Sequence, residues 1–203
     1  TNSVVRFARE RFPDSHLTVM GHSLFGHTAL AWFAQNPELA PDAFVAIAVN
    51  IWGRRWEPSL VRWCRKLSVA SLLFGFSRFN GSLPARKLRV GSMDEPHSYL
   101  NHLYRSVFLG KWDDADGNSY HDALRDLPCP VLHVLSTGDR WIADPESSRT
   151  FMGVIGSRRT ELLVGDRSSP QGLRDLQPDH MEIVTDPSCE PIWDAIARWN
   201  PTH

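Results

Sequence analysis

The sequence predicts an α/β fold, with a mostly parallel sheet that has helices on both faces. Short apolar segments at about 17–20, 44–49 and 131–135 alternate with helical patterns, which is typical of this class. The segment 44–49, Phe-Val-Ala-Ile-Ala-Val, is continuously apolar and indicates a strand buried on both faces. With 203 residues, 42% of them hydrophobic, the chain can bury one substantial core.

In the first part of the chain, helix and strand alternate. A helical pattern over about 3–11 is stopped by Pro13, and the apolar strand at 17–20 follows. A turn rich in glycine then leads into a helix from about 24 to 36, which Pro37 closes. The alternation resumes after residue 126, with strands at 131–135 and 160–164 and helices at 145–155 and 191–199.

Between these parts, residues 53–126 lack the alternation and read as a helical insertion, so that 1–52 and 127–203 form the core. At this position an insertion covers the carboxyl ends of the strands, where ligands bind in α/β sheets. Its aromatic residues either line an apolar pocket or pack the insertion onto itself. Its cations either bind substrate or form a solvated helix face; they are Arg54, Arg55, Arg62, Arg65 and Lys66.

The composition excludes several classes of protein. A net charge of −1 gives no electrostatic reason to bind nucleic acid. No apolar segment approaches the roughly 18 residues that a membrane span needs. The three cysteines lie too far apart for a metal or redox motif and are too few for a disulfide framework. We therefore expect no metal site and a reducing, cytoplasmic location.

Ser23 is the candidate nucleophile. It lies in Gly21-His22-Ser23, between the strand at 17–20 and the following helix, so that its hydroxyl stands on a sharp corner at the carboxyl end of a strand. The corner also directs a helix N-terminus at the hydroxyl. The alternative is that Ser23 only caps the helix.

Asp139 and His180 are the candidate partners of Ser23, because each follows a later strand of the core. An imidazole can accept the seryl proton, and a carboxylate can hold the imidazole in the correct tautomer. His22 and His27 flank the serine too closely to lie opposite it, so they are a turn residue and a packing residue. Asp144 could replace Asp139, although it lies next to the proline of the following helix.

These motifs resemble the α/β-hydrolase superfamily. Gly21-His22-Ser23-Leu24 is similar to its nucleophile elbow, Val131 to Asp139 to its penultimate strand with the acid, and Asp179-His180 to its histidine loop. The resemblance implies a triad in the order Ser23, Asp139, His180, an oxyanion donor at the Leu24 N–H and no cofactor. The sheet then corresponds to the C-terminal portion of an α/β-hydrolase sheet, with a helical cap.

The elbow departs from the family pattern at one position. The family has Gly-x-Ser-x-Gly, whereas here Phe25 takes the last position and Gly26 follows one residue later. We expect the Phe25 ring either to displace a neighbour, at a cost of about 1 to 3 kcal/mol, or to point into space that the family does not usually leave.

A second departure concerns the beginning of the chain. In the family several strands precede the elbow, and a loop after one of them supplies a second oxyanion donor. We therefore expect an N-terminal segment outside this numbering, or a second polypeptide, to complete the sheet, since a sheet without it exposes an apolar edge.

The sequence thus predicts a serine hydrolase that cleaves an ester, thioester or related small acyl substrate through an acyl-enzyme on Ser23. Two alternatives remain open. The first is an acyltransferase of the same fold, and the second is a non-catalytic binding or assembly subunit that retains the triad residues.

Overall fold

The structure of the chain, a computed structural model, describes residues 2–88 and 93–201. The chain divides into two compact units, residues 1–50 with 120–203 and residues 51–119. The predicted insertion spans 53–126, whereas the second unit spans 51–119, so residues 120–126 belong to the first unit. Residues 89–92 of the predicted insertion lie outside the described residues. Among the described helices, none combines the length and apolar character that crossing a membrane requires.

The first unit is built on a parallel four-stranded sheet. Its strand order is β1-β2-β5-β6, so β1 forms one edge and pairs only with β2 among the described strands. All five residues of β2 are buried, as the continuous apolar sequence predicts. The strands are β1 (Thr18–His22), β2 (Ala43–Ile47), β5 (Val131–Ser136) and β6 (Arg159–Val164).

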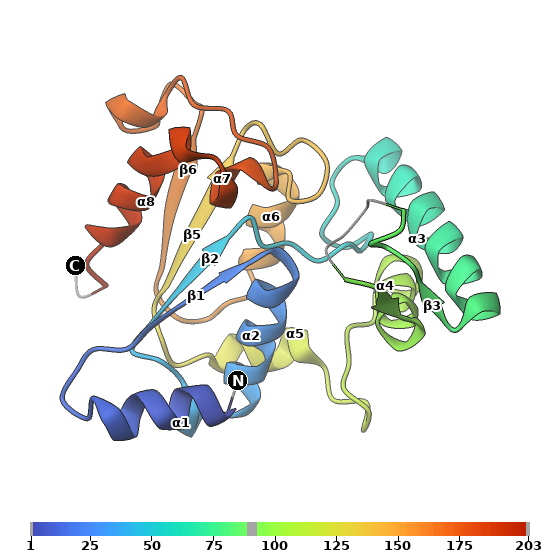
Figure 1. Cartoon of the computed structure of the whole chain (residues 1–203), viewed down its shortest axis with the longest axis horizontal. Helices are drawn as coiled ribbons and strands as arrows, with labels where there is room; N and C mark the ends of the chain where they lie inside the picture. Colours follow the sequence, from blue (N-terminus) through green and yellow to red (C-terminus); the bar gives the residue numbers. More distant parts are fainter. Residues whose placement is uncertain (1, 89–92, 202–203) are drawn as a thin grey trace. The chain divides into compact units, whose positions relative to one another are not determined.

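Helices cover both faces of this sheet, with α8 on one side and α2 and α6 on the other (Figure 1). On the α8 face, Ile192 packs in one cluster with Val45 and Leu132. On the α2 face, the rings of Phe33 and Phe44 meet edge to face. The helices of this unit are α1 (Asn2–Arg11), α2 (Ser23–Gln35), α5 (Tyr120–Ala123), α6 (Pro145–Met152), α7 (Glu182–Thr185) and α8 (Glu190–Ala197), with 3₁₀ turns at Pro37–Leu39, Leu124–Asp126, Gln171–Leu173 and Pro187–Cys189.

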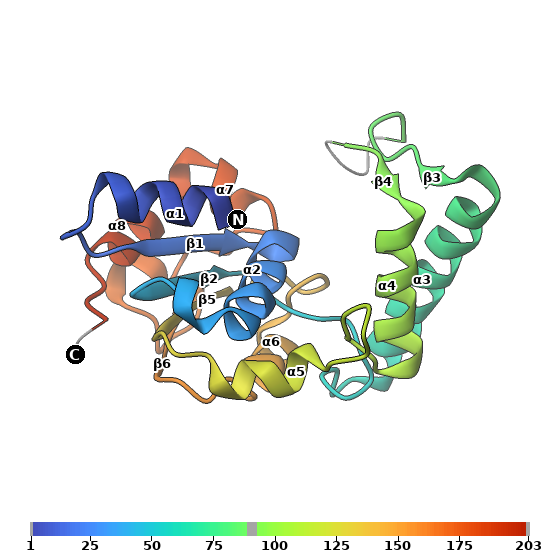
Figure 2. The same ribbon diagram turned by 90° about the horizontal axis from the view of Figure 1, so that it is seen from below.

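The second unit contains two packed helices, α3 (Leu60–Asn80) and α4 (His97–Leu109), and a short antiparallel pair, β3 (Ser82–Leu83) with β4 (Glu95–Pro96) (Figure 2). The ring of Tyr104 stacks on Phe74 and on Phe108, and Trp63 Nε1 donates to the carbonyl of Val107. These aromatic side chains therefore pack the unit onto itself.

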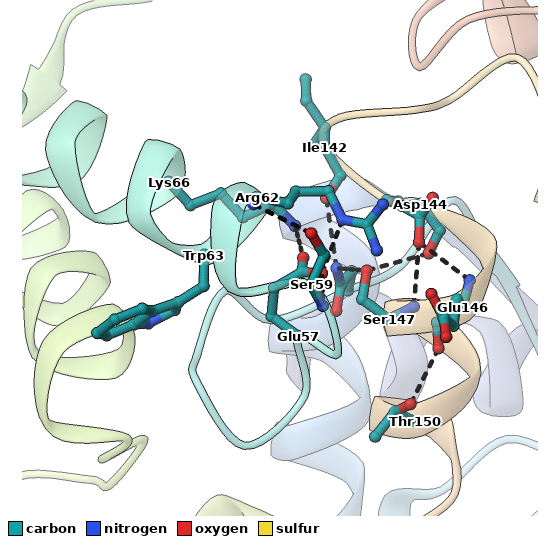
Figure 3. A network of polar contacts seen from close by, with 12 residues as sticks. Glu57, Ser59, Arg62, Trp63, Lys66, Ile142, Asp144, Glu146, Ser147 and Thr150 are labelled. Atoms are coloured by element: carbon teal, nitrogen blue, oxygen red, sulfur yellow. Dashed lines mark hydrogen bonds and ion pairs between the residues drawn. The ribbon is translucent and has the colours of Figure 1, made fainter.

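A buried ion pair joins α3 to the segment before it. Lys66 Nζ lies 2.8 Å from Glu57 Oε2, and Arg62 Nε lies 2.7 Å from Glu57 Oε1 (Figure 3). Lys66 and Glu57 are only 1% and 2% exposed. Lys66 is therefore not part of a solvated charged face; it neutralises a buried carboxylate.

Candidate active site

Ser23 stands on the turn between β1 and α2. Strand β1 ends at His22 and α2 begins at Ser23, which has a φ of 52°. A left-handed conformation at a residue other than glycine is costly and persists only where surrounding structure holds it. The turn therefore holds the Ser23 side chain at the carboxyl end of β1.

Close packing of α2 on β1 depends on two glycines, Gly21 and Gly26. A Cβ on Gly21 would lie 2.6 Å from Gly26 Cα, and a Cβ on Gly26 would lie 2.8 Å from Gly21 O and still closer to Val49 Cγ2. Phe25, by contrast, is 52% exposed. Of the two alternatives for Phe25, the exposed ring favours the second, and Gly26 makes the close contact.

His180 lies between Ser23 and Asp139. Its Nε2 is 2.7 Å from Ser23 Oγ, and its Nδ1 is 2.6 Å from Asp139 Oδ2. His180 and Asp139 are 7% and 3% exposed, so the bond between them is shielded from water, whereas the bond to Ser23 is only partly buried. The three residues predicted from the sequence thus form one continuous hydrogen-bonded chain.

Backbone donors stabilise the charge of Asp139. Its Oδ1 accepts hydrogen bonds of 3.0 Å from the N–H groups of Ile142 and Ala143. Burial opposes ionisation, but His180 and these two amides outweigh it, and the pKa of Asp139 lies below its ordinary value. Asp139 is therefore a carboxylate at neutral pH and accepts from His180 Nδ1.

The loops that carry Asp139 and His180 are joined to each other. Ser136 Oγ donates to the carbonyl of Pro178 at 2.7 Å, and Gly138 N donates to Ser136 Oγ. A Cβ on Gly138 would lie 2.5 Å from Pro178 O, so only glycine permits this approach. These contacts fix the separation of Asp139 and His180.

The alternative acid, Asp144, has a different place. Its Oδ1 accepts from the N–H groups of Glu146 and Ser147, and so it caps the N-terminus of α6. His27, on α2, is a packing residue as expected, and burial lowers its pKa to about 4. Neither residue belongs to the hydrogen-bonded chain at Ser23.

Leu24 follows Ser23 in the first turn of α2, where backbone N–H groups have no acceptor within the helix. Its N–H therefore lies at the helix N-terminus; its role as an oxyanion donor stays a prediction. The positive end of the helix dipole adds to this field.

His22 makes a contact that the sequence did not indicate. Its Nε2 lies 2.8 Å from the backbone carbonyl oxygen of His180, and the two ring centroids are 4.8 Å apart. The two residues are 158 positions apart in the chain, so no local pattern could have revealed the contact. His22 is thus more than a turn residue.

Solved structures resemble this chain over nearly its whole length. One such structure belongs to the metagenome-derived lipolytic enzymes LipS and LipT, and it is similar to this chain with a TM-score of 0.56 at 17% identity. The match covers 97% of this chain and 69% of the lipolytic enzyme. The monoacylglycerol lipase of Paleococcus ferrophilus gives a TM-score of 0.54 at 14% identity, with coverages of 98% and 74%. The chain has the α/β-hydrolase fold.

An esterase domain from Rhodothermus marinus is also similar, with a TM-score of 0.50 at 18% identity, and covers 97% of this chain and 66% of its own. No protein-family model and no curated protein matches the sequence. The α/β-hydrolase fold is thus shared with lipases and esterases, and about a quarter to a third of each of these chains has no counterpart here.

Proposed function

We propose that the protein is a serine hydrolase that cleaves a carboxylic ester, thioester or related acyl substrate. The observation that carries this proposal is the hydrogen-bonded chain from Ser23 Oγ through His180 to Asp139, at 2.7 and 2.6 Å. A hydroxyl, an imidazole and a carboxylate in this arrangement form the activated nucleophile of acyl transfer.

In the first step Ser23 Oγ attacks the carbonyl carbon while His180 Nε2 takes the seryl proton. The resulting imidazolium is stabilised by the ionised Asp139 and gives its proton to the departing alkoxide or thiolate. In the second step His180 takes a proton from water, whose oxygen attacks the acyl carbon. The acid product leaves, and the proton returns to Ser23.

The negative oxygen of each tetrahedral intermediate needs hydrogen-bond donors. We assign one of these donors to the Leu24 N–H, because it lies in the first turn of α2 directly after the nucleophile. The lipases and esterases of the same fold support an acyl substrate.

Labelling with a fluorophosphonate tests the proposal. We expect stoichiometric modification of Ser23, complete loss in Ser23→Ala, and full labelling in Ser188→Ala, a matched change at an exposed serine of the same unit. Absence of labelling in the wild-type chain, when it is folded, would support a non-catalytic subunit instead. Turnover of an ester in the presence of an added alcohol distinguishes a hydrolase from an acyltransferase, because an acyltransferase forms a new ester with the alcohol.

We also propose that a further strand pairs with the free edge of β1, from a preceding segment or a second polypeptide. Edge strands present unpaired backbone groups, and Met20 in β1 is 56% exposed. The similar lipase and lipolytic enzyme have additional chain without a counterpart here, which supports this proposal.

The cysteines support a reducing compartment such as the cytoplasm, which we propose as the location. Cys64, Cys129 and Cys189 are all free thiols. Burial raises the pKa of Cys129 to about 11, so this thiol is inert at neutral pH.

A further inference from the structure

We propose that His22 is a positioning residue that holds the backbone of His180 in register with the nucleophile; this inference rests on the proposed function. His22 Nε2 lies 2.8 Å from the His180 carbonyl oxygen, and the planes of the two rings are inclined by 40°. Because a carbonyl oxygen only accepts, His22 Nε2 carries the hydrogen and donates it.

The elbow thereby contacts His180 at two points. Ser23 Oγ bonds to the ring at Nε2, and the adjacent His22 bonds to the main chain of the same residue. A hydrogen bond to the ring alone leaves the backbone of His180 free to shift, whereas the second bond fixes its distance from β1. Catalytic geometry is sensitive to such shifts, since a displacement of about 1 Å costs roughly 10²-fold in rate.

Other contacts of the loop around His180 join it to the Asp139 loop, through Ser136 and the Pro178 carbonyl, and not to the elbow. The side chain of Asp179 accepts from the N–H groups of Met181 and Glu182, which closes a local turn. The helix that follows, α7, has only four residues. Local turns shape the loop but do not tie it to Ser23, and the bond from His22 does.

The charge state of His22 is compatible with a position next to His180, which becomes positively charged during the proposed reaction. Burial, as the largest effect, lowers the pKa of His22 below its ordinary value, and the hydrogen bond to the His180 backbone opposes this only in part. A neutral ring with a hydrogen on Nε2 can donate without adding a second positive charge next to the imidazolium.

Three substitutions separate the hydrogen bond from ring packing. In His22→Gln the amide nitrogen reaches the position of imidazole Nε2; in His22→Asn the shorter side chain does not; His22→Phe keeps a ring without a donor. We expect His22→Gln to retain the wild-type rate of fluorophosphonate labelling, and His22→Asn and His22→Phe to lose roughly three- to tenfold, the size of one lost hydrogen bond.

Hydrolysis of a short-chain nitrophenyl ester provides the second measurement. We expect kcat to fall with the labelling rate while KM stays constant, because His22 bonds to His180 and not to substrate. His16→Phe, at an exposed histidine of the same unit, is the matched control and should behave as wild type. A thermal unfolding curve of each variant would verify that it is folded at the assay temperature.

The outcomes distinguish this inference from the proposed function. If wild-type Ser23 is not labelled, both the proposed function and the inference about His22 are wrong. If wild type is labelled and all three variants react at its rate, or if His22→Gln is as slow as His22→Phe, the positioning role is overturned while the hydrolase stands.

Discussion

Gly26 is the residue on which the close approach of α2 to β1 depends. Gly26→Ala forces its Cβ against Gly21 O and Val49 Cγ2, so we expect a loss of about 1 to 3 kcal/mol in the free energy of unfolding. Phe25→Ala, at an exposed ring, should change it by less than about 0.5 kcal/mol. Urea denaturation of both variants measures the difference, and equal losses would contradict it.

The ionisation of Asp139 predicts that the free energy of unfolding depends on pH. Its pKa is lowered in the folded chain from the ordinary 3.8, so its ionised form stabilises the fold above that value and the contribution is lost as the pH falls through the lowered pKa. The difference in unfolding free energy between wild type and Asp139→Asn should therefore be constant above about pH 5 and shrink in more acid solution. Urea denaturation at pH 7, 5 and 3.5 measures it.

The same substitution should slow the labelling of Ser23 by up to roughly 10⁴-fold, because the amide favours the wrong tautomer of the histidine. The rate is measured at pH 7, where the wild-type carboxylate is ionised. A wild-type rate in Asp139→Asn would show that another group orients His180.

At the scale of elements, α6 offers a contrast between a capping and an orienting carboxylate. Asp144→Ala removes the side chain that accepts from Glu146 and Ser147 at the N-terminus of α6, which costs about 0.5 to 2 kcal/mol of stability. Because the two ring nitrogens of His180 bond to Asp139 and Ser23, labelling of Ser23 should continue at the wild-type rate. Denaturation and labelling measured on the same sample test both the loss of stability and the unchanged labelling rate. Slow labelling of Ser23 in a folded variant would indicate that Asp144 takes part in the active site.

Helix α3 is tied to the preceding segment by the buried pair of Lys66 and Glu57. Lys66→Met removes the cation at Glu57 Oε2, while Arg62 and the Ser59 N–H still bond to Oε1. Removing one partner of a buried pair costs about 3 kcal/mol. We expect faster hydrogen exchange of the α3 amides in this variant and partial recovery in the double variant with Glu57→Gln. Recovery in the double variant would show that the unpaired charge of Glu57 causes the loss of stability. No recovery would show that the loss comes from the missing packing of the lysine side chain.

The pH dependence of this pair has the same sign as that of Asp139. Burial opposes ionisation of Glu57, but Lys66 and Arg62 outweigh it and lower its pKa. The stabilisation is therefore present above the ordinary pKa of a glutamate and is lost in acid.

The strands of the four-stranded sheet and helix α2 were predictable because their patterns are local. Strand β2 is continuously apolar and entirely buried, and prolines mark the beginning of α6 and the end of α2. The phase of α2 was not predictable: adjacent helical residues differ by 100° around the axis, so whether position 25 or 26 faces β1 depends on the turn at Ser23. The four-residue α7 carries too short a pattern to detect.

At the scale of the whole molecule, the candidate triad residues were predictable because each follows a core strand, and parallel strands bring their carboxyl ends to one edge of the sheet. The supporting contacts were not. The bond from Ser136 to the Pro178 carbonyl and the bond from His22 to His180 join residues 42 and 158 positions apart, and side-chain type alone does not indicate them.

The free edge of β1 leads to a prediction about association. Met20 pairs in register with Val45, and so its side chain lies on the α8 face of the sheet, but it is 56% exposed. Among the described strands only β2 pairs with β1. We therefore expect the 203-residue chain to self-associate as its concentration rises, because exposed strand edges template pairing.

Met20→Lys places a charge on this edge, a device by which natural sheets prevent pairing. We expect it to shift the sedimentation coefficient towards that of the monomer, with Ser23 labelling per chain unchanged. Leu72→Lys, at an exposed residue of α3 in the other unit, is the matched control and should leave association as it is. If Leu72→Lys disperses the chain and Met20→Lys does not, association runs through α3 and the proposed strand partner of β1 loses its support.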